Sequence, residues 1–292
     1  MSMQSGKISA FVVAYNRARI LETCLRALRF ADEIIVVDKS STDDTRAVAR
    51  RHATRVVTVP WTPTVEETRA FALSLCSYDW ILFLDDDECL SPGAPPFLRA
   101  QVGQAEADIY EFPLRHYILG VHDETAYYWP EHHVRFFRRG TVGFSNTVHG
   151  GVHRLTEKIM RVPPEANVCI HHLSHPDVAS WIERTNRYTG RPDRTRAEDS
   201  GHDLVRFAHA RIDQWLARSP DTTPNGYPAA VAVLRAVYDI VDRLKTWEEE
   251  RGLDGNALFI QACERLDTAY GITPPRSMLD RLRHRWFKAT SA

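Results

Sequence analysis

The 292-residue sequence lacks several features that would place it in a specialised class of protein. No apolar stretch approaches the roughly 18 residues that a membrane-spanning helix needs. The five cysteines are odd in number and form no C-x-x-C pair, which argues against a disulfide scaffold or a cysteine zinc site. The 37 basic and 38 acidic residues nearly cancel, so no global field would attract nucleic acid or an anionic membrane.

We also expect no secretory signal peptide, because the apolar run near the N-terminus is short and ends in a polar turn. Together with the scattered thiols, this favours a reducing, cytoplasmic location. The chain is 43% hydrophobic, which is enough for a sizeable core. Its length allows one large domain or one domain with an extension.

The first 85 residues alternate short apolar runs with amphipathic helical segments. The runs are rich in Val and Ile, which is typical of strands buried on both faces. We therefore predict an α/β fold in which helices cover both faces of a mostly parallel sheet. The predicted strands span residues 8–14, 33–38, 55–60 and 80–85.

The rest of the chain changes character twice. Residues 105–175 are rich in aromatic side chains and histidine, and strands are expected near 108–118, 133–138 and 168–173. From about residue 177 the pattern is helical, which predicts a domain over 1–200 and a helical C-terminal extension over 201–292. The expected helices span 177–189, 202–217, 228–250, 256–270 and 276–289.

Polar residues follow three of the predicted strands. The carboxyl ends of parallel strands meet at one edge of a sheet, and ligands bind beyond that edge in open α/β sheets. We therefore expect one site to collect the residues at these strand ends. They are Ala14, Tyr15 and Asn16 after the first strand, Asp38 after the second, and Asp85, Asp86 and Asp87 after the fourth.

The stretch WILFLDDDECL ends a buried strand in four acids, Asp85 to Glu88. Carboxylates this close repel one another and raise one another's pKa. A divalent cation with a preference for oxygen ligands, Mg²⁺ or Mn²⁺, would neutralise them and hold a diphosphate. The alternative is a solvated turn whose acids cap the next helix. The position at the end of a parallel strand favours the metal site.

Three further residues fit a nucleotide, each with a structural alternative. Tyr15 is suited to stacking on a nucleobase or to packing at its strand end. Asp38 is suited to accepting a hydrogen bond from a base or ribose, or to capping the following helix. Arg69 would reach the phosphates if it faced the site, and would otherwise lie on a solvated helix face.

These residues belong to stretches that resemble a family 2 glycosyltransferase with the GT-A fold. The matching stretches are VVAYNRARILETCLRAL, EIIVVDKSSTDDT, ETRAFAL and WILFLDDDECL, in that order and spacing. The resemblance is specific over residues 7–90, the nucleotide-binding half. Within the acceptor half, 91–200, YYWPEHHVRFFRRG and NVCIHHLSH resemble a subgroup that includes bacterial lipopolysaccharide-core glucosyltransferases.

The resemblance implies that a sugar is transferred from a nucleotide-diphosphate donor with inversion at the anomeric carbon. Lys39 departs from it, because an acidic or small residue is usual there. By the resemblance, Tyr15 and Asp38 contact the nucleoside, Arg69 the base or phosphates, Asp85 the ribose, and Asp87 the metal, with His171 or His172 as a further metal ligand.

An inverting transfer needs a general base that deprotonates the acceptor hydroxyl. Glu131 in WPEHH is the favoured candidate, because it matches the aromatic-Pro-acid segment of the subgroup; the alternative is a surface acid in a loop. The histidine-rich middle, with His149 and His153 four residues apart, leaves a zinc hydrolase as a rival enzyme. A non-catalytic protein that binds nucleotide sugars is a further alternative.

The acceptor is open among a glycan, a lipid and a small molecule. The last predicted helix mixes Arg and Lys with Leu, Trp and Phe. That composition fits either peripheral contact with the inner face of a membrane or packing of an apolar stripe on the domain, and we favour packing. The helical tail is also a candidate for assembly into an oligomer.

Overall fold

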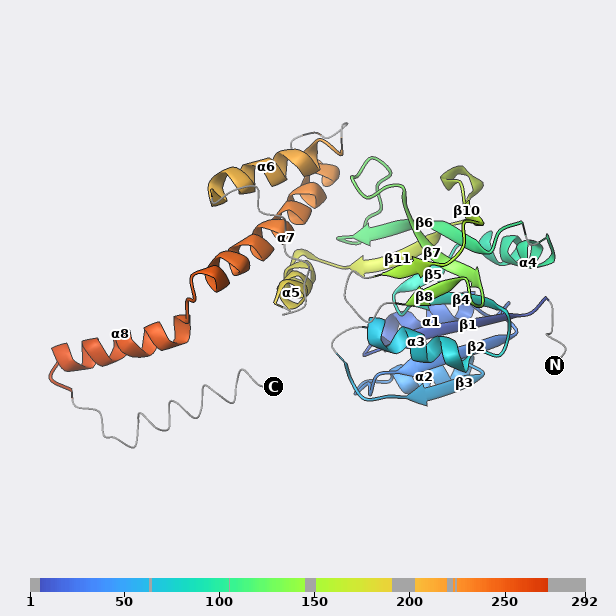
Figure 1. Ribbon diagram of the computed structural model, residues 1–292, viewed down its shortest axis with the longest axis horizontal. Coiled ribbons are helices and arrows are strands. Elements are labelled where there is room, and N and C mark those ends of the chain that lie inside the picture. The colour runs from blue at the N-terminus through green and yellow to red at the C-terminus, as the bar shows by residue number, and fades with distance from the viewer. Residues whose placement is uncertain are drawn as a thin grey trace. The chain divides into compact units, whose positions relative to one another are not determined.

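Figure 1 shows the computed structural model, which describes residues 6–62, 65–104, 106–144, 151–190, 203–219, 223 and 225–272. The chain forms two compact units, Met1–Arg243 and Leu244–Ala292. The strands are β1 (Ile8–Ala14), β2 (Glu33–Asp38), β3 (Arg55–Thr58), β4 (Trp80–Asp85), β5 (Glu88–Leu90), β6 (Ile109–Ile118), β7 (Glu131–Arg138), β8 (Val142–Phe144), β9 (Val152–Arg154), β10 (Ile159–Arg161) and β11 (Ile170–His175). The helices are α1 (Ala18–Ala27), α2 (Thr45–His52), α3 (Glu66–Leu75), α4 (Ala94–Gln104), α5 (Val178–Thr189), α6 (Leu204–Leu216), α7 (Tyr227–Glu250) and α8 (Gly255–Ala269), with one 3₁₀ turn at Pro164–Ala166.

The central sheet has nine strands in the order β3-β2-β1-β4-β7-β6-β11-β5, with β10 beside β6. Strands β1 to β4 pair in parallel, as the short apolar runs predict. Strand β7 enters antiparallel between β4 and β6, and β11 runs parallel to β6. The predicted mostly parallel α/β sheet is confirmed. Strands β8 and β9 form a separate two-stranded ribbon.

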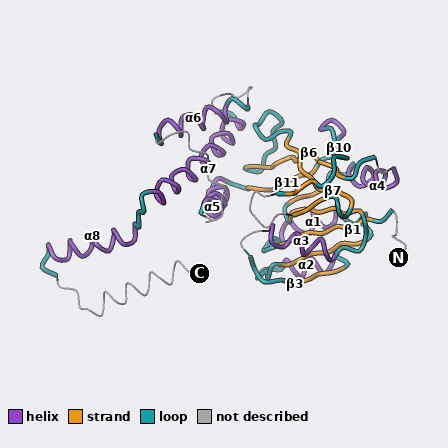
Figure 2. Tube along the Cα trace, in the orientation of Figure 1, coloured by secondary structure: helices purple, strands orange, loops and turns teal. Residues whose placement is uncertain are grey.

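Alternate residues of β1 enter two different cores, one on each face of the sheet, because successive side chains of a strand point to opposite faces. Val12 packs with Leu25 of α1 in the core that α1, α2 and α4 cover. Phe11 packs with Ala72 of α3 in the core that α3 and β8 cover. Helices α1, α2 and α3 lie beside the strands in Figure 2. Burial on both faces explains why the strand sequences are continuously apolar.

The main departure from the sequence pattern is β5. Only three residues long, it begins with Glu88 and pairs antiparallel with β11, far along the chain. Local hydrophobic periodicity carries no signal for so short a strand with so distant a partner. The pairing sets His172 opposite Glu88, so β11 lies beside the acidic turn.

Among the helices after β11, α5, α6 and α8 each begin after an aspartate that caps them. Asp177 caps α5 by accepting a hydrogen bond from the backbone N–H of Ser180, in a capping box.

Side-chain hydrogen bonds also join these helices to one another and to the sheet. Trp215 of α6 donates a hydrogen bond from Nε1 to Asp239 of α7 at 2.7 Å. The Tyr227 hydroxyl lies 2.8 Å from the carbonyl oxygen of Ile118 at the end of β6. These contacts belong to the compact unit that holds the sheet, which extends to Arg243.

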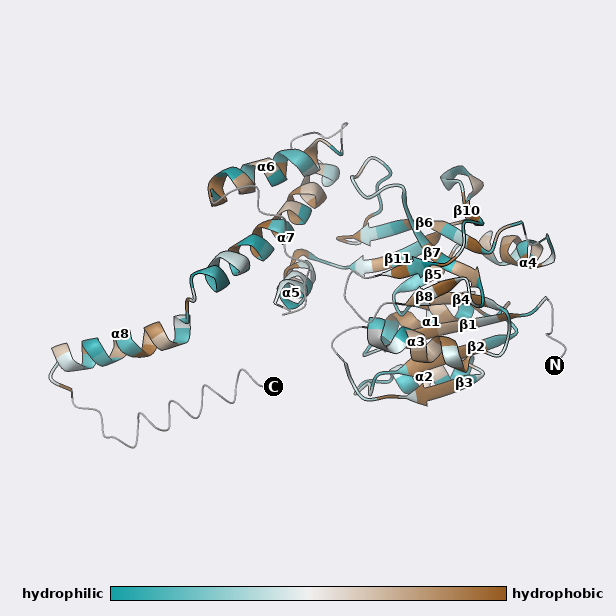
Figure 3. Cartoon of the chain, in the orientation of Figure 1, coloured by the Kyte–Doolittle hydropathy of each residue, from teal (hydrophilic) through white to brown (hydrophobic). Residues whose placement is uncertain are grey.

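The second unit contains the end of α7 and all of α8. Helix α8 has no buried residue, and Figure 3 shows apolar and polar positions along its length. Leu258, Phe259 and Leu266 are exposed on it. Among the described residues, no helix combines the length and apolar content that crossing a bilayer requires. The helix predicted at 276–289 lies outside the described residues.

Candidate active site

The polar residues at the ends of β1, β2 and β4 come together as the parallel sheet predicts. Ala14, the last residue of β1, pairs with Asp38, the last residue of β2. The backbone N–H of Tyr15 donates to Asp86 Oδ2 at 3.0 Å, which ties the end of β1 to the acidic turn after β4. One edge of the sheet therefore brings these predicted site residues together.

Asn16 and Asp38 hold the loop after β2. Asn16 has a left-handed φ of 51°, and its side-chain oxygen accepts a hydrogen bond from the backbone N–H of Thr42 at 2.8 Å. Asp38 is fully buried; it accepts from the backbone N–H of Ser41 at 3.2 Å and faces Arg46 Nε at 3.1 Å. A contact between Asp38 and a nucleoside stays a prediction.

Arginines from several elements neutralise the four acids of the turn. The dense group of carboxylates is tolerated because each acid has at least one cationic partner within the folded chain. Because these partners come from distant segments, only the folded chain assembles them. The pairs are Asp85 with Arg69 and Arg135, Asp86 with Arg17, Asp87 with Arg17 and Arg184, and Glu88 with Arg135.

Asp87 carries the most cationic surroundings of the group. His172 Nε2 lies 3.4 Å from its Oδ1, and Arg17 and Arg184 approach its Oδ2 at 3.3 and 3.6 Å. Burial raises the pKa of this carboxyl, but His172, Arg17 and Arg184 outweigh burial and hold the pKa below its usual value. Asp87 is therefore ionised at neutral pH.

Asp86 behaves differently, although it is the neighbouring residue. Burial, with the charge of Asp87 added to it, raises the pKa of Asp86 to about 7. Adjacent carboxylates that share a buried site separate in this way, because both cannot ionise at the same low cost. At neutral pH Asp87 is thus firmly ionised, whereas its neighbour Asp86 is partly protonated.

Glu88 has a structural role. It is 1% exposed, and Arg135 Nε and Nη2 each donate to its carboxylate at 2.7 Å. The same carboxylate accepts from the backbone N–H of Asp85 at 3.1 Å. A bidentate arginine pair of this kind fixes geometry as well as neutralising charge. It therefore orients the acidic turn.

A cavity of about 260 Å³ opens at the strand ends, and we call it the strand-end cavity. Tyr15 and Trp61 stand in its wall with ring centroids 6.1 Å apart, and both are exposed. The other lining residues are Arg17, Lys39, Thr62, Val65, Glu66, Arg69, Asp85, Asp86, Asp87, His172, Arg184, Arg187 and Tyr188.

One corner of this cavity holds two of the residues predicted as metal ligands, Asp87 and His172. Asp87 and His172 present a carboxylate oxygen and an imidazole nitrogen 3.4 Å apart, a spacing that suits two ligands of one ion. His171 lies next to His172 on β11, and its Nδ1 contacts the Tyr117 hydroxyl at 3.0 Å. Alternation along the strand thus brings His172, and not His171, to the acids.

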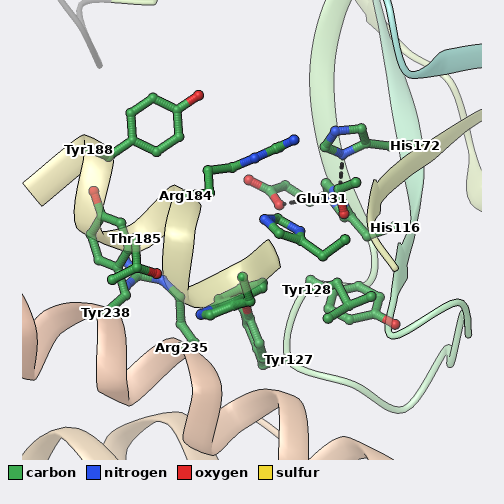
Figure 4. Close-up of a pocket in the computed structure, with 14 residues that line it drawn as sticks. His116, Tyr127, Tyr128, Glu131, His172, Arg184, Thr185, Tyr188, Arg235 and Tyr238 are labelled. Atoms are coloured by element: carbon green, nitrogen blue, oxygen red, sulfur yellow. Dashed lines mark hydrogen bonds and ion pairs between the residues drawn. The ribbon is translucent and has the colours of Figure 1, made fainter. Parts of the chain in front are cut away.

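A second cavity of about 310 Å³ adjoins the first, and we call it the aromatic cavity (Figure 4). His172, Arg184 and Tyr188 line both cavities, so the two meet at these residues. The remaining residues come from β6, the loop after it, β7, β11, α5 and α7. They are His116, Ile118, Tyr127, Tyr128, Glu131, Ser174, His175, Trp181, Thr185, Arg235 and Tyr238.

Glu131, the favoured base, lines the aromatic cavity at the start of β7. Its two carboxylate oxygens lie 3.2 Å from His116 Nε2 and 3.1 Å from His133 Nε2. Burial raises the pKa of Glu131, but the two histidines outweigh burial and lower the pKa below its usual value. Burial lowers the pKa of His116. The carboxylate is therefore ionised and faces the cavity beside neutral histidine.

The sequence alone did not point to several residues of the site. Arg17 follows the Tyr15-Asn16 pair directly, so its position next to the predicted strand end was the available signal. Arg184 and Tyr188 lie on α5, and Trp61 follows β3. No local pattern distinguishes an arginine that faces a cavity from one on a solvated helix face.

Comparison with known proteins gives a family and several relatives. The family model described as glycosyl transferase family 2 matches residues 9–157. An uncharacterized glycosyltransferase of Rickettsia bellii is 27% identical over 197 residues, which cover 63% of this chain and 65% of that protein. Lipopolysaccharide core biosynthesis glycosyltransferase LpsC of Rhizobium meliloti is 27% identical and is matched over 50% of this chain and 56% of its own length. The chain thus spans between half and two thirds of these relatives.

Solved structures also resemble the chain. The crystal structure of S. aureus TarS matches with a TM-score of 0.44 and 14% identity, over 74% of this chain and 44% of that one. Glucosyl-3-phosphoglycerate synthase from Mycobacterium tuberculosis, in complex with Mn²⁺, UDP and glucosyl-3-phosphoglycerate, matches with a TM-score of 0.31 and 28% identity. That match covers 38% of this chain and 44% of the synthase.

Proposed function

We propose that this chain catalyses an inverting, metal-dependent glycosyl transfer. The chain belongs to glycosyl transferase family 2, because the family model matches just over half of its residues. The proposed activity is glycosyl transfer, and the mostly parallel α/β sheet agrees with the GT-A fold expected from the sequence. The proposed donor is a nucleoside diphosphate sugar, and the proposed acceptor group is a hydroxyl. Cytoplasmic location remains part of this proposal.

One observation carries the proposal: the strand-end and aromatic cavities meet at His172, Arg184 and Tyr188. Asp87 lies on the strand-end side of that junction, and Glu131 lies in the wall of the aromatic cavity. A donor held on one side and an acceptor on the other would bring the anomeric carbon to the junction. This arrangement supports attack from the face opposite the leaving group, which inverts the configuration.

The strand-end cavity has the chemistry that a nucleoside diphosphate needs. Tyr15 and Trp61 offer aromatic faces for the base. Arg17, Arg184 and Arg187 bring positive charge for the diphosphate. Asp85 and Arg69 form an ion pair at the cavity wall. If Asp85 bound the ribose or Arg69 bound a phosphate, the contact with the ligand would replace part of this ion pair.

Asp87 and His172 are the residues that would hold Mg²⁺ or Mn²⁺. When bound, the cation would neutralise the diphosphate and act as a Lewis acid toward the leaving group. Arg17 and Arg184 would neutralise part of the negative charge of the diphosphate as well. Asp87 stays ionised because of its cationic neighbours, as a metal ligand must.

Glu131 would act on the acceptor. Its ionised carboxylate accepts the proton of the acceptor hydroxyl while that oxygen forms a bond to the anomeric carbon. The bond between the anomeric carbon and the diphosphate oxygen breaks, and the diphosphate leaves with both bonding electrons. His116 and His133 hold the carboxylate during this step.

The aromatic cavity supports a saccharide acceptor. Tyr127, Trp181, Tyr188 and Tyr238 offer aromatic surface that suits the apolar faces of sugar rings. The name of LpsC associates that relative with the lipopolysaccharide core, which is a saccharide of the cell envelope. We extend this class of acceptor to the present chain as a proposal.

A donor screen tests the proposed function. Nucleoside diphosphates and their sugars are added with Mn²⁺ to wild type, to Asp87→Asn and to the exposed-acid control Glu124→Gln, and the thermal unfolding midpoint is measured. A ligand at 100 times its Kd stabilises the folded state by about 2.7 kcal/mol. The shift should occur in wild type and the control and vanish in Asp87→Asn, with sugar transfer lost in parallel. Absence of any nucleotide-dependent shift, or transfer by Asp87→Asn at the wild-type rate, would refute the proposal.

A further inference from the structure

We propose that His116, Glu131 and His133 form a second cation site, which takes Zn²⁺ and silences Glu131 as a base. The zinc site rests on geometry alone, whereas its inhibitory effect rests on the proposed function of Glu131. Its ligands differ from Asp87 and His172, the residues proposed for the other cation.

The three side chains converge from two neighbouring strands. Glu131 and His133 are two residues apart at the start of β7, so their side chains point to the same side of the strand. His116 approaches from β6, which pairs antiparallel with β7. One ligand atom from each of the three lies within 4.8 Å of the others.

The spacing of the ligand atoms suits one zinc ion. Glu131 lies 3.2 Å from His116 Nε2 and 3.1 Å from His133 Nε2. Zinc bonds to nitrogen and oxygen ligands measure about 2.0 to 2.2 Å, so tetrahedral ligands stand a little over 3 Å apart. Two histidines and one glutamate also form a known zinc ligand set with a fourth position left open.

His133 supplies an independent observation. Its Nε2 atom is buried and makes no hydrogen bond, although it lies 3.1 Å from Glu131 Oε1. A buried polar nitrogen without a hydrogen-bond partner carries a desolvation cost that a metal bond would remove. The other side of the site is oriented already: His116 Nδ1 contacts His172 Nδ1 at 2.7 Å, an outer contact of the kind that fixes metal-binding histidines.

The donor set decides which metal enters. Two imidazoles favour zinc over Mg²⁺, which prefers carboxylate, carbonyl and water oxygens. A carboxylate bound to zinc no longer accepts a proton from the acceptor. Zinc bound at this site would therefore inhibit transfer.

Zinc binding to metal-free protein tests the site directly. Titration against a chromophoric chelator measures the affinity of wild type, His133→Gln and the matched control His132→Gln, whose Nε2 contacts the carbonyl oxygen of Val162 at 2.9 Å. Loss of an orienting partner alone typically weakens metal affinity about 10 to 100-fold. We therefore expect His133→Gln to lose at least about tenfold, and wild type and His132→Gln to bind one zinc ion.

His116→Gln serves as a second variant in case His133→Gln does not fold, and circular dichroism checks each protein. Equal zinc affinity in wild type and both site variants, or equal loss in His132→Gln, would overturn the site.

Asp87→Asn should keep this zinc ion, because Asp87 belongs to the other proposed cation site. If the protein transfers sugar, zinc added to the Mn²⁺-containing assay should inhibit wild type more than His133→Gln; zinc binding without inhibition would overturn the silencing. These binding results stand even if the proposed reaction is wrong.

Discussion

The Nδ1 atoms of His116 and His172 lie 2.7 Å apart, so one ring donates a hydrogen bond and the other accepts it. Their Nε2 atoms face opposite ends of the site: His172 faces Asp87 at 3.4 Å and His116 faces Glu131 at 3.2 Å. A continuous series of side chains therefore joins the proposed cation corner to the proposed base.

That contact links the tautomers of the two rings. If His172 binds a cation through Nε2, its proton stays on Nδ1 and is donated to His116 Nδ1. The proton of neutral His116 then sits on Nε2 and points at Glu131. A cation at one cavity would thus favour a hydrogen bond that holds the base at the other.

The two adjacent histidines of β11 give a matched test of the cation corner. His172→Ala should weaken Mn²⁺ binding at least about tenfold and slow transfer, because it removes a ligand of the proposed ion. His171→Ala should leave Mn²⁺ affinity within about twofold, since His171 contacts Tyr117 and lines neither cavity. Electron paramagnetic resonance of free Mn²⁺ measures both affinities. Equal losses in the two variants would exclude His172 as the ligand.

The proposed base predicts a separation of binding from chemistry. Glu131→Gln should lower kcat about 10² to 10⁴-fold, the usual contribution of a general base, while the donor-induced shift in unfolding midpoint stays unchanged. The exposed acid Glu157 supplies the control, Glu157→Gln, for which both quantities should match wild type. Single-turnover kinetics and thermal unfolding measure the two effects. Near-normal turnover of Glu131→Gln would remove this residue from the role.

The parallel sheet and its polar edge follow from the sequence because the signals are local. Runs such as residues 33–38 and 80–85 are apolar on both faces, and strand direction alone places Tyr15, Asp38 and Asp85 at one edge. These inferences need no knowledge of how distant segments pack.

The cationic surroundings do not follow from the sequence, because they depend on tertiary packing. Arg184 reaches Asp87 only after β11 and α5 are in place. The alternation of β11 predicts that His171 and His172 face opposite sides, but not which of them meets the acids. The short strand β5 decides that question, by pairing His172 with Glu88.

The buried pair of Glu88 and Arg135 predicts a large effect on stability. Glu88→Gln leaves Arg135 buried with its charge uncompensated on that side, and breaking a buried pair in this way costs about 3–5 kcal/mol. Arg138→Met is the matched control, because Arg138 is exposed and lies 3.9 Å from Asp108. Its loss should change the free energy of unfolding by at most about 0.5 kcal/mol. Urea unfolding measures both; a cost below about 1 kcal/mol for Glu88→Gln would contradict the assignment.

His175 predicts how stability responds to acid. Burial, with the charges of Arg184 and His172, lowers the pKa of His175 to about 3 from its usual 6.5. Between those two pH values the unfolded chain binds a proton at this position and the folded chain does not. The free energy of unfolding therefore falls as the pH falls below 6.5, by at most about 1.4 kcal/mol per pH unit from this residue.

His175→Gln removes that dependence while keeping a neutral side chain of similar size. Relative to wild type, the variant should gain up to about 2 kcal/mol in free energy of unfolding between pH 7.5 and pH 5, measured by urea denaturation. His153→Gln is the control, because His153 is exposed on β9 and should follow the wild-type curve. Parallel curves for His175→Gln and wild type would show that His175 takes up its proton in the folded state, so that the wall of the aromatic cavity would be charged in mild acid.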